Sequence, residues 1–355
     1  MRESSRLRVA SHGLIVAAAF FPGQIATAQQ TLVVGPTGAF ATIASAIAAA
    51  APGDTVLVQA GVYSETIDVD KGIRLIGESG AHLEMGLFSF PVRVHDVAAG
   101  ELLVLSGFSA GGMPNSIDSR IEVTNCAGIV ALADLAQGGF ERWFVRATGA
   151  NQLHVTNVAL RSADIADGNA VIRGCVFDTE FLEALSTGSG RTALVQCTVH
   201  GGSGVFPGPA IVQLGGELAV TRSAVTATGN NPAIVTQAPG TILLDPSAVL
   251  TPASGRPAVS GPASVATFEF GSLSASTTGQ LLNMTAHGPV GAPFLTLLSL
   301  PVAEAASPFG LAWIHPTNWG IAASGTFPST RLVSSTLPHP ARPVMRLVAP
   351  GPEVA

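Results

Sequence analysis

Charged side chains are scarce in this 355-residue chain, at 11% of all residues, and aromatic side chains make up only 6%. Lys71 is the one lysine and Tyr63 the one tyrosine. This share of charge is about half that of an ordinary soluble domain, so few side chains are available for acid–base chemistry. The formal net charge of −6 disfavours nucleic acid and anionic membranes as partners.

The sequence also lacks the motifs of several common enzyme classes. It contains no GxxxxGK[ST] phosphate-binding loop and no HExxH zinc motif. One GxSxG match runs from Gly107 to Gly111, but Met113 and Pro114 follow closely and disfavour the helix that a nucleophile elbow requires. We therefore interpret Ser109 as part of a coincidental match in a glycine-rich chain.

Long apolar runs are absent beyond the N-terminus, where residues 1–28 have the features of a secretory signal peptide. Arg2 provides positive charge, Gly13–Phe21 is a short apolar run, and Ala26–Ala28 fits the small-x-small cleavage pattern. The apolar run is too short to span a bilayer. We expect an exported protein, secreted or at the cell surface, with no transmembrane segment after removal of the signal.

The segment after the signal alternates between short strands, turns and one helix. We predict a strand from Thr31, a helix over Phe40–Ala50, a strand over Thr55–Gln59 and an alternating apolar–polar stretch over Tyr63–Val69. This arrangement resembles the opening of right-handed parallel β-helix (pectin-lyase-like) proteins. The residues that carry the resemblance are Phe40, Ile43, Ala46, Ile47, Ala50, Pro52–Thr55, Gly61–Tyr63, Glu65 and Leu75–Gly77.

From residue 71 to about residue 250 one unit recurs, in which a short alternating strand precedes a small or amide residue and a second strand. Because a single coil cannot bury its apolar side alone, repeated units predict a stacked solenoid. The alignment of units predicts one inward column of apolar residues and a second column of small residues after the bend. The first column is Val123, Val155, Ile172, Leu194 and Val220, and the second is Cys126, Val158, Cys175, Cys197 and Ser223.

Two further predictions concern the bend. Asn125 and Asn157 are assigned to the same bend position, where asparagine tolerates turn geometry. Cys126, Cys175 and Cys197 are interpreted as buried, inert members of the interior stack. Their odd number leaves at least one thiol without a partner in the chain, and a Cys175–Cys197 disulfide is geometrically conceivable without being implied.

The domain organisation follows from a change in the sequence pattern near residue 262, where the repeat ends. We expect the β-helix to occupy residues 29–262, with its helix covering the N-terminal end. Residues 263–355 lose the repeat and read as short strands separated by glycine and proline, typical of a small β-sandwich. This part resembles a small all-β module of exported bacterial proteins.

The resemblance to β-helix enzymes implies chemistry on polysaccharides, by an Arg or Lys base with calcium-binding carboxylates in lyases or by paired carboxylates in hydrolases. Asp164, Asp167, Arg173 and His154 are the candidate catalytic residues. Asp178, Glu180 and Glu183 form an acidic cluster that is a candidate calcium site, and no other cofactor is expected.

Strong scaffold signals beside sparse charge favour an exported, non-catalytic β-helix protein with a structural or binding role at the cell surface or outside the cell. Its expected partner is a polysaccharide or another cell-surface component. The alternative is a carbohydrate-active enzyme, a polysaccharide lyase or glycoside hydrolase, acting on an acidic polysaccharide. That alternative requires Asp164, Asp167 and Arg173 to meet on one face.

Overall fold

The computed structural model describes residues 29–85, 92–112, 119–137, 142–179, 181–204 and 206–267, together with the strands between Ser272 and Val348. The predicted signal peptide, residues 1–28, lies outside the described residues. Within the described part of the chain, no helix is long and apolar enough to cross a membrane.

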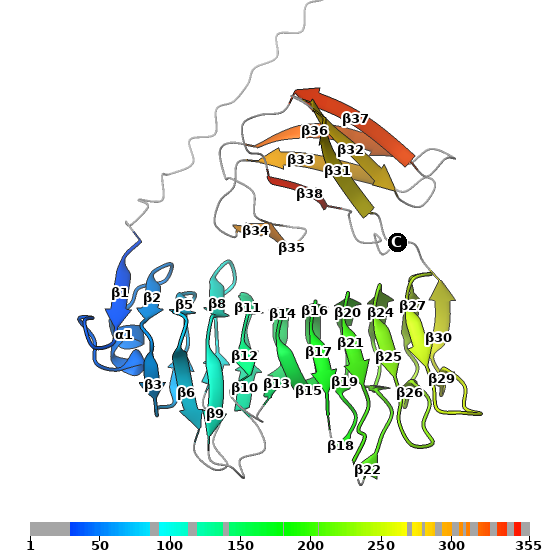
Figure 1. Cartoon of the computed structure of the whole chain (residues 1–355), viewed down its shortest axis with the longest axis horizontal. Helices are drawn as coiled ribbons and strands as arrows, with labels where there is room; N and C mark the ends of the chain where they lie inside the picture. Colours follow the sequence, from blue (N-terminus) through cyan, green and yellow to red (C-terminus); the bar gives the residue numbers. More distant parts are fainter. Residues whose placement is uncertain are drawn as a thin grey trace, which may run out of the picture.

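The chain winds into coils whose strands stack side by side along the long axis in Figure 1. The longest continuous ladder, here called sheet A, has 11 strands, and neighbouring strands in it run parallel. Its strands are β1 (Thr31–Val34), β2 (Thr55–Val58), β5 (Arg74–Gly77), β8 (Leu102–Ser106), β11 (Ile129–Ala133), β14 (Ala150–Thr156), β16 (Gly168–Arg173), β20 (Arg191–Val195), β24 (Glu217–Thr221), β27 (Thr241–Leu244) and β30 (Ser264–Thr267).

Two more parallel sheets complete the coils. Sheet B has four strands: β3 (Gly61–Tyr63), β6 (Ala81–Met85), β9 (Ser109–Gly112) and β12 (Ala136–Gln137). Sheet C has 13 strands: β4 (Ile67–Val69), β7 (Val92–His95), β10 (Ser119–Thr124), β13 (Trp143–Thr148), β15 (Ala159–Ile165), β17 (Val176–Asp178), β19 (Leu185–Thr187), β21 (Thr198–His200), β23 (Ile211–Gln213), β25 (Ala224–Thr226), β26 (Ile234–Thr236), β28 (Val249–Thr251) and β29 (Val259–Ser260). A short parallel pair joins β18 (Phe181–Leu182) to β22 (Phe206–Pro207). The predicted parallel β-helix is confirmed.

The one helix of the described residues, α1 (Ile43–Ala49), is shorter than the predicted Phe40–Ala50. Phe40 instead forms a bridge with Val34, which holds the chain extended before the helix begins. Thr42 caps the helix by accepting from the Ser45 amide at 3.2 Å. The Glu65 carboxylate accepts from the first helical amides, including that of Ile43 at 2.8 Å, so a β-helix coil fixes the start of the helix.

The inward column on sheet A is confirmed from Val155 onward. Val155, Ile172, Leu194 and Val220 are successive register partners, and all four are buried. The placement of Val123 in this column is wrong, because Val123 belongs to β10 of sheet C and pairs with Val94 and Ala147. The partner of Val155 on the preceding coil is Leu132.

The sequence pattern likewise assigns the bend residues to one corner, although they belong to two. Asn125 and Asn157 both adopt left-handed backbone, with φ of 52° and 54°, but they lie at different corners of the coil. Asn125 follows β10 of sheet C, beside Gly149. Asn157 follows β14 of sheet A, and its Nδ2 donates to Oδ1 of Asp134 at 3.1 Å. Gly174, Gln196 and Arg222 continue the sheet A corner with positive φ.

The predicted second column, of small residues after the bend, also combines residues from two different corners. Val158, Cys175, Cys197 and Ser223 follow successive bends of sheet A and are buried. Cys126 is also buried, but it follows the sheet C bend at Asn125. The three cysteines are free thiols, and their burial is as predicted.

Parallel pairing continues to Thr267 at the end of β30, beyond the predicted boundary at residue 262. The following strands pair antiparallel, in two three-stranded sheets of order β31-β32-β37 and β36-β33-β38 and one hairpin, β34-β35. Their bounds are β31 (Ser272–Thr278), β32 (Leu281–His287), β33 (Pro293–Ser299), β34 (Ala305–Ser307), β35 (Gly310–Ala312), β36 (Trp319–Thr326), β37 (Leu332–Pro338) and β38 (Val344–Val348).

Candidate functional site

His154 and Arg173 are the two candidate catalytic residues that the structure brings together. His154 lies on the outer face of sheet A, between the inward Leu153 and Val155. Its strand β14 pairs directly with β16, which ends at Arg173. Partial burial, with a smaller contribution from the nearby Arg173 guanidinium, lowers the pKa of His154 to about 4. The imidazole is therefore neutral near pH 7 and suited to packing more than to holding a charge.

The neighbours of His154 support this interpretation. Its register partners on the flanking coils are Ala131 and Val171, and the same outer column continues through Ala193 and Ala219. Glu122, at the matching position of an earlier repeat unit, lies on sheet C instead. A substrate groove with a charged lining is not formed by these small apolar side chains.

The lowered pKa of His154 predicts an acid-sensitive fold. Between the unfolded value of about 6.5 and the folded value of about 4, the unfolded chain binds a proton that the folded chain does not. Stability therefore falls as the pH decreases through this window, by roughly 3 kcal/mol in total at its lower end. Measured by urea unfolding from pH 7 to pH 4, His154→Gln should reduce this loss. Arg173→Gln should reduce it to a smaller extent, and an unchanged pH slope in His154→Gln would contradict the assignment.

Asp164 lies on a different sheet from His154 and Arg173. It sits on the outer face of sheet C, where its Oδ2 is 3.7 Å from Nε of Arg146. Register partners extend this contact into a column of alternating charge across five successive coils. We name it the charge ladder, and its members are Asp68, Arg93, Glu122, Arg146 and Asp164.

Asp167 is separated from Asp164 by the corner between β15 and β16. Its Oδ1 accepts from the Ser189 hydroxyl at 2.7 Å, so the carboxylate joins two successive turns. The four candidate catalytic residues therefore occupy an outer face of sheet C, a turn and the outer face of sheet A. The enzymatic alternative requires Asp164, Asp167 and Arg173 on one face, and the structure places them on different faces and a turn.

In the acidic cluster proposed for calcium, the Asp178 carboxylate forms an ion pair with Arg142. Nη2 of Arg142 lies 2.6 Å from Oδ2 of Asp178, and the same guanidinium also donates to the Asp178 carbonyl. Glu183 is partly buried and lies beyond β18, and Glu180 lies outside the described residues. Among the residues that the structure describes, no group of three or more His, Cys, Asp or Glu side chains is placed to hold a metal ion.

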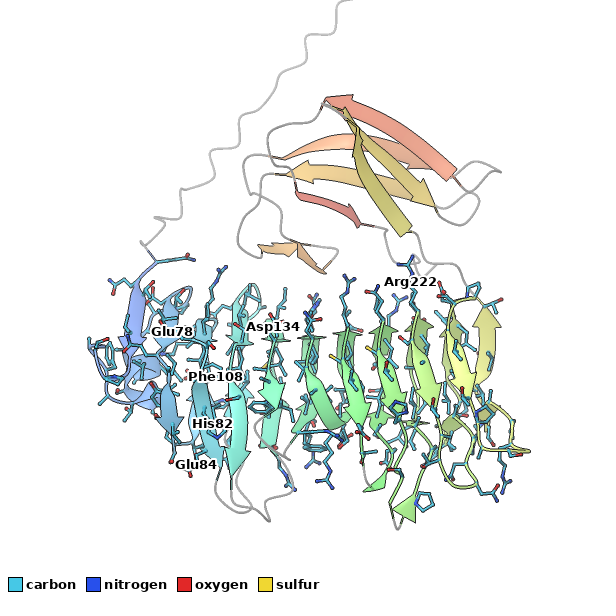
Figure 2. The ribbon with its side chains drawn as sticks, viewed as in Figure 1. Glu78, His82, Glu84, Phe108, Asp134 and Arg222 are labelled. Atoms are coloured by element: carbon cyan, nitrogen blue, oxygen red, sulfur yellow. The ribbon has the colours of Figure 1, made fainter. Side chains whose placement is uncertain are left out.

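One polar pair was not identified as such from the sequence. Nδ1 of His82, on β6, lies 3.0 Å from the Ser109 hydroxyl on β9, and Figure 2 shows His82 and Glu84 close together on β6. The Ser109 hydroxyl donates to the Ala81 carbonyl at 3.3 Å, which leaves its oxygen to accept from His82. This direction is opposite to the one that activates a serine nucleophile.

The surroundings of Ser109 also disfavour a role as a nucleophile. Glu84 accepts from the Ser64 hydroxyl, so its described contact is with Ser64 rather than with the imidazole. Ser109 begins a strand that runs to Gly112, not the helix of a nucleophile elbow. Met113 and Pro114 lie outside the described residues. We interpret the His82–Ser109 pair as a cross-coil hydrogen bond that stabilises sheet B.

Other charged groups also pair between neighbouring coils. Nε of Arg191 lies 2.5 Å from Oε1 of Glu217 on sheet A. His95 lies 2.9 Å from Asp68 and 3.0 Å from Asp96 on sheet C. The hydrogen bond to Asp96 contributes most to raising the pKa of His95. The charged groups of the described solenoid thus form separate pairs and do not converge on one catalytic cluster.

Comparisons with known proteins give solved structures but no family. No family model and no curated protein matches this chain. Two crystal structures of the pectin methylesterase from Aspergillus niger, one deglycosylated and one penultimately deglycosylated, are each 12% identical to it. They cover 67% of this chain and 84% or 85% of their own, with TM-scores of 0.28 and 0.25. The description of the fold therefore rests on the strand register given above.

Proposed function

We propose that this chain is a non-catalytic β-helix protein with a structural or binding role at the cell surface or outside the cell. The observation that carries the proposal is the distribution of its charge. A lyase or hydrolase site needs a base and carboxylates around one bond of the substrate. Here the three carboxylates contact three different groups at separate places in the solenoid. The contacts are Asp164 with Arg146, Asp167 with Ser189, and Asp178 with Arg142.

The outer face of sheet C is the binding surface that fits this role. Its charge ladder presents guanidinium and carboxylate groups in alternation on rigid strands, with Arg93 and Arg146 exposed to solvent. Phe144 is partly buried beside the ladder, and the Arg120 guanidinium lies 5.8 Å from its ring centroid. Such a flat polar surface offers hydrogen bonds to sugar hydroxyls and an aromatic edge for a sugar ring. A polysaccharide is therefore the partner we propose.

Two assays on the purified protein test the proposal. The first incubates it with neutral and acidic polysaccharides, with and without calcium, and measures unsaturated products, reducing ends and released acid. We expect no turnover by folded protein. Substantial turnover on any polysaccharide would refute the non-catalytic role and direct mutagenesis to Asp164, Asp167 and Arg173.

The second assay measures binding to the same immobilised polysaccharides. We expect Arg93→Gln combined with Arg146→Gln to weaken binding at least tenfold. The matched control Arg191→Gln removes one arginine of the Arg191–Glu217 pair on sheet A and should leave binding unchanged. Equal losses in the two variants would place the binding surface elsewhere, and no binding to any polysaccharide would remove the proposed partner.

A further inference from the structure

Cys175 and Cys197 are direct neighbours on consecutive coils. The residues two places before them, Arg173 and Val195, are register partners in sheet A. The residues that follow them, Val176 and Thr198, are register partners in sheet C. The Thr198 amide also donates to the Cys175 carbonyl at 3.0 Å. The two cysteines therefore hold the same position at the same corner.

This placement meets the Cα spacing that a disulfide requires. Register neighbours in a sheet are about 4.8 Å apart, and the Cα atoms of disulfide-bonded cysteines are usually about 4.4–6.8 Å apart. The Cys197 thiol donates to the Ile172 carbonyl at 3.2 Å. Ile172 belongs to β16, the strand that leads to Cys175, so the sulfur of Cys197 points toward the coil of its neighbour. The sulfur of Cys175 lies 3.7 Å from the Val155 carbonyl of the coil before it, so the disulfide requires the Cys175 side chain to rotate toward Cys197.

The third cysteine has no such neighbour. Cys126 follows β10 of sheet C, and its thiol donates to the Thr124 carbonyl of that strand at 3.3 Å. Burial raises the pKa of Cys126, which disfavours the reactive thiolate. The register thus separates one isolated thiol from one stacked pair, a distinction that the spacing of the three cysteines in the sequence does not make.

We propose that Cys175 and Cys197 form an inter-coil disulfide when the chain folds in the presence of a small-molecule disulfide oxidant such as oxidised glutathione. The sulfur of one of the two cysteines attacks the oxidant, forms a mixed disulfide and releases one glutathione thiol. The sulfur of the other cysteine then attacks the cysteine sulfur of this mixed disulfide and releases the second. The two protons lost by the cysteines end on the two released thiols, so two cysteine thiols are oxidised and one glutathione disulfide is reduced.

Either cysteine can make the first attack, because the contact between the two thiols forms only in the folded coil. Both side chains are buried in the folded coil, so the reaction belongs to folding, before the corner closes over them.

The experiment refolds the full chain from denaturant, once with a mixture of oxidised and reduced glutathione and once with dithiothreitol. Circular dichroism verifies the fold, and the protein is then acid-quenched, denatured, alkylated and analysed by mass spectrometry. After oxidising refolding we expect one alkylated cysteine, Cys126, and a peptide cross-link between Cys175 and Cys197. Three alkylated cysteines in folded protein, a cross-link that includes Cys126, or a persistent glutathione adduct on Cys175 or Cys197 would each overturn the proposal.

Variants keep the test independent of any folding defect at the pair. Cys126→Ser leaves the pair intact and should refold to a protein with no alkylated cysteine. Cys175→Ser and Cys197→Ser should each retain two alkylated cysteines after the same oxidising refolding. An alkylated pair in folded Cys126→Ser protein would count against the disulfide even if both single-pair variants failed to fold.

Discussion

Gly190→Ala is expected to lower the free energy of unfolding by about 3–5 kcal/mol. Gly190 precedes β20 and has a φ of +97°, a conformation that L-amino acids rarely adopt. A Cβ added there would lie 2.0 Å from the carbonyl oxygen of Gly168 on the preceding coil. That oxygen is backbone, so relieving the clash requires β16 and β20 to move apart.

The glycine column shows why the coil has no room to adjust. Gly168, Gly190, Gly216 and Gly240 hold the same place on successive coils. A Cβ at Gly216 would lie 2.3 Å from the Gly190 oxygen, and one at Gly240 would lie 2.7 Å from the Gly216 oxygen. The coils therefore stack at this corner through close backbone contact, and a methyl group at one position clashes with the backbone of the preceding coil.

Gly100→Ala is the matched control for this prediction. Gly100 has a similar φ of +85°, but a Cβ there would meet no atom within 4 Å. Urea unfolding followed by circular dichroism compares the two variants with the wild type. The difference between their losses isolates the steric clash from the backbone strain, and equal losses would show that the coils tolerate a side chain at this corner.

The sequence predicts the scaffold well because each coil must satisfy local rules. The apolar spacing of Ile43 and Ile47 indicates the helix, and the alternation around Val155, Ile172, Leu194 and Val220 indicates an inward column. The corner to which a unit belongs is harder to predict, since one coil contains two strand–bend units with the same pattern. Asn125 and Asn157 share a left-handed backbone yet follow different sheets.

The candidate site depends more heavily on the register, which spacing alone does not give. His82 and Ser109 are 27 residues apart and meet only because β6 pairs with β9. Asp164 and Asp167 are close in the chain but are separated by the corner between β15 and β16. Closeness in the sequence therefore does not place Asp164 and Asp167 on the same face. The pairs that form between coils join residues that are far apart in the sequence.

Trp143→Ala is the second substitution with a large expected effect, a loss of about 3–5 kcal/mol in the free energy of unfolding. Trp143 begins β13, is fully buried, and is the largest side chain of the described core. Its register partners are Ser119 and Leu160, so the indole lies between two coils. Truncation leaves a cavity that the stacked backbone cannot close, for the same reason that the glycine corner cannot widen.

The indole nitrogen gives this prediction its control. Nε1 of Trp143 donates to the Ala136 carbonyl at 3.0 Å, which fixes the ring against the end of sheet B. Trp143→Phe keeps an aromatic ring but loses this hydrogen bond, so we expect an intermediate loss of about 1–3 kcal/mol. Urea unfolding measures both variants. Equal losses in the two variants would show that the hydrogen bond, which both lack, rather than the volume of the ring, holds these coils together.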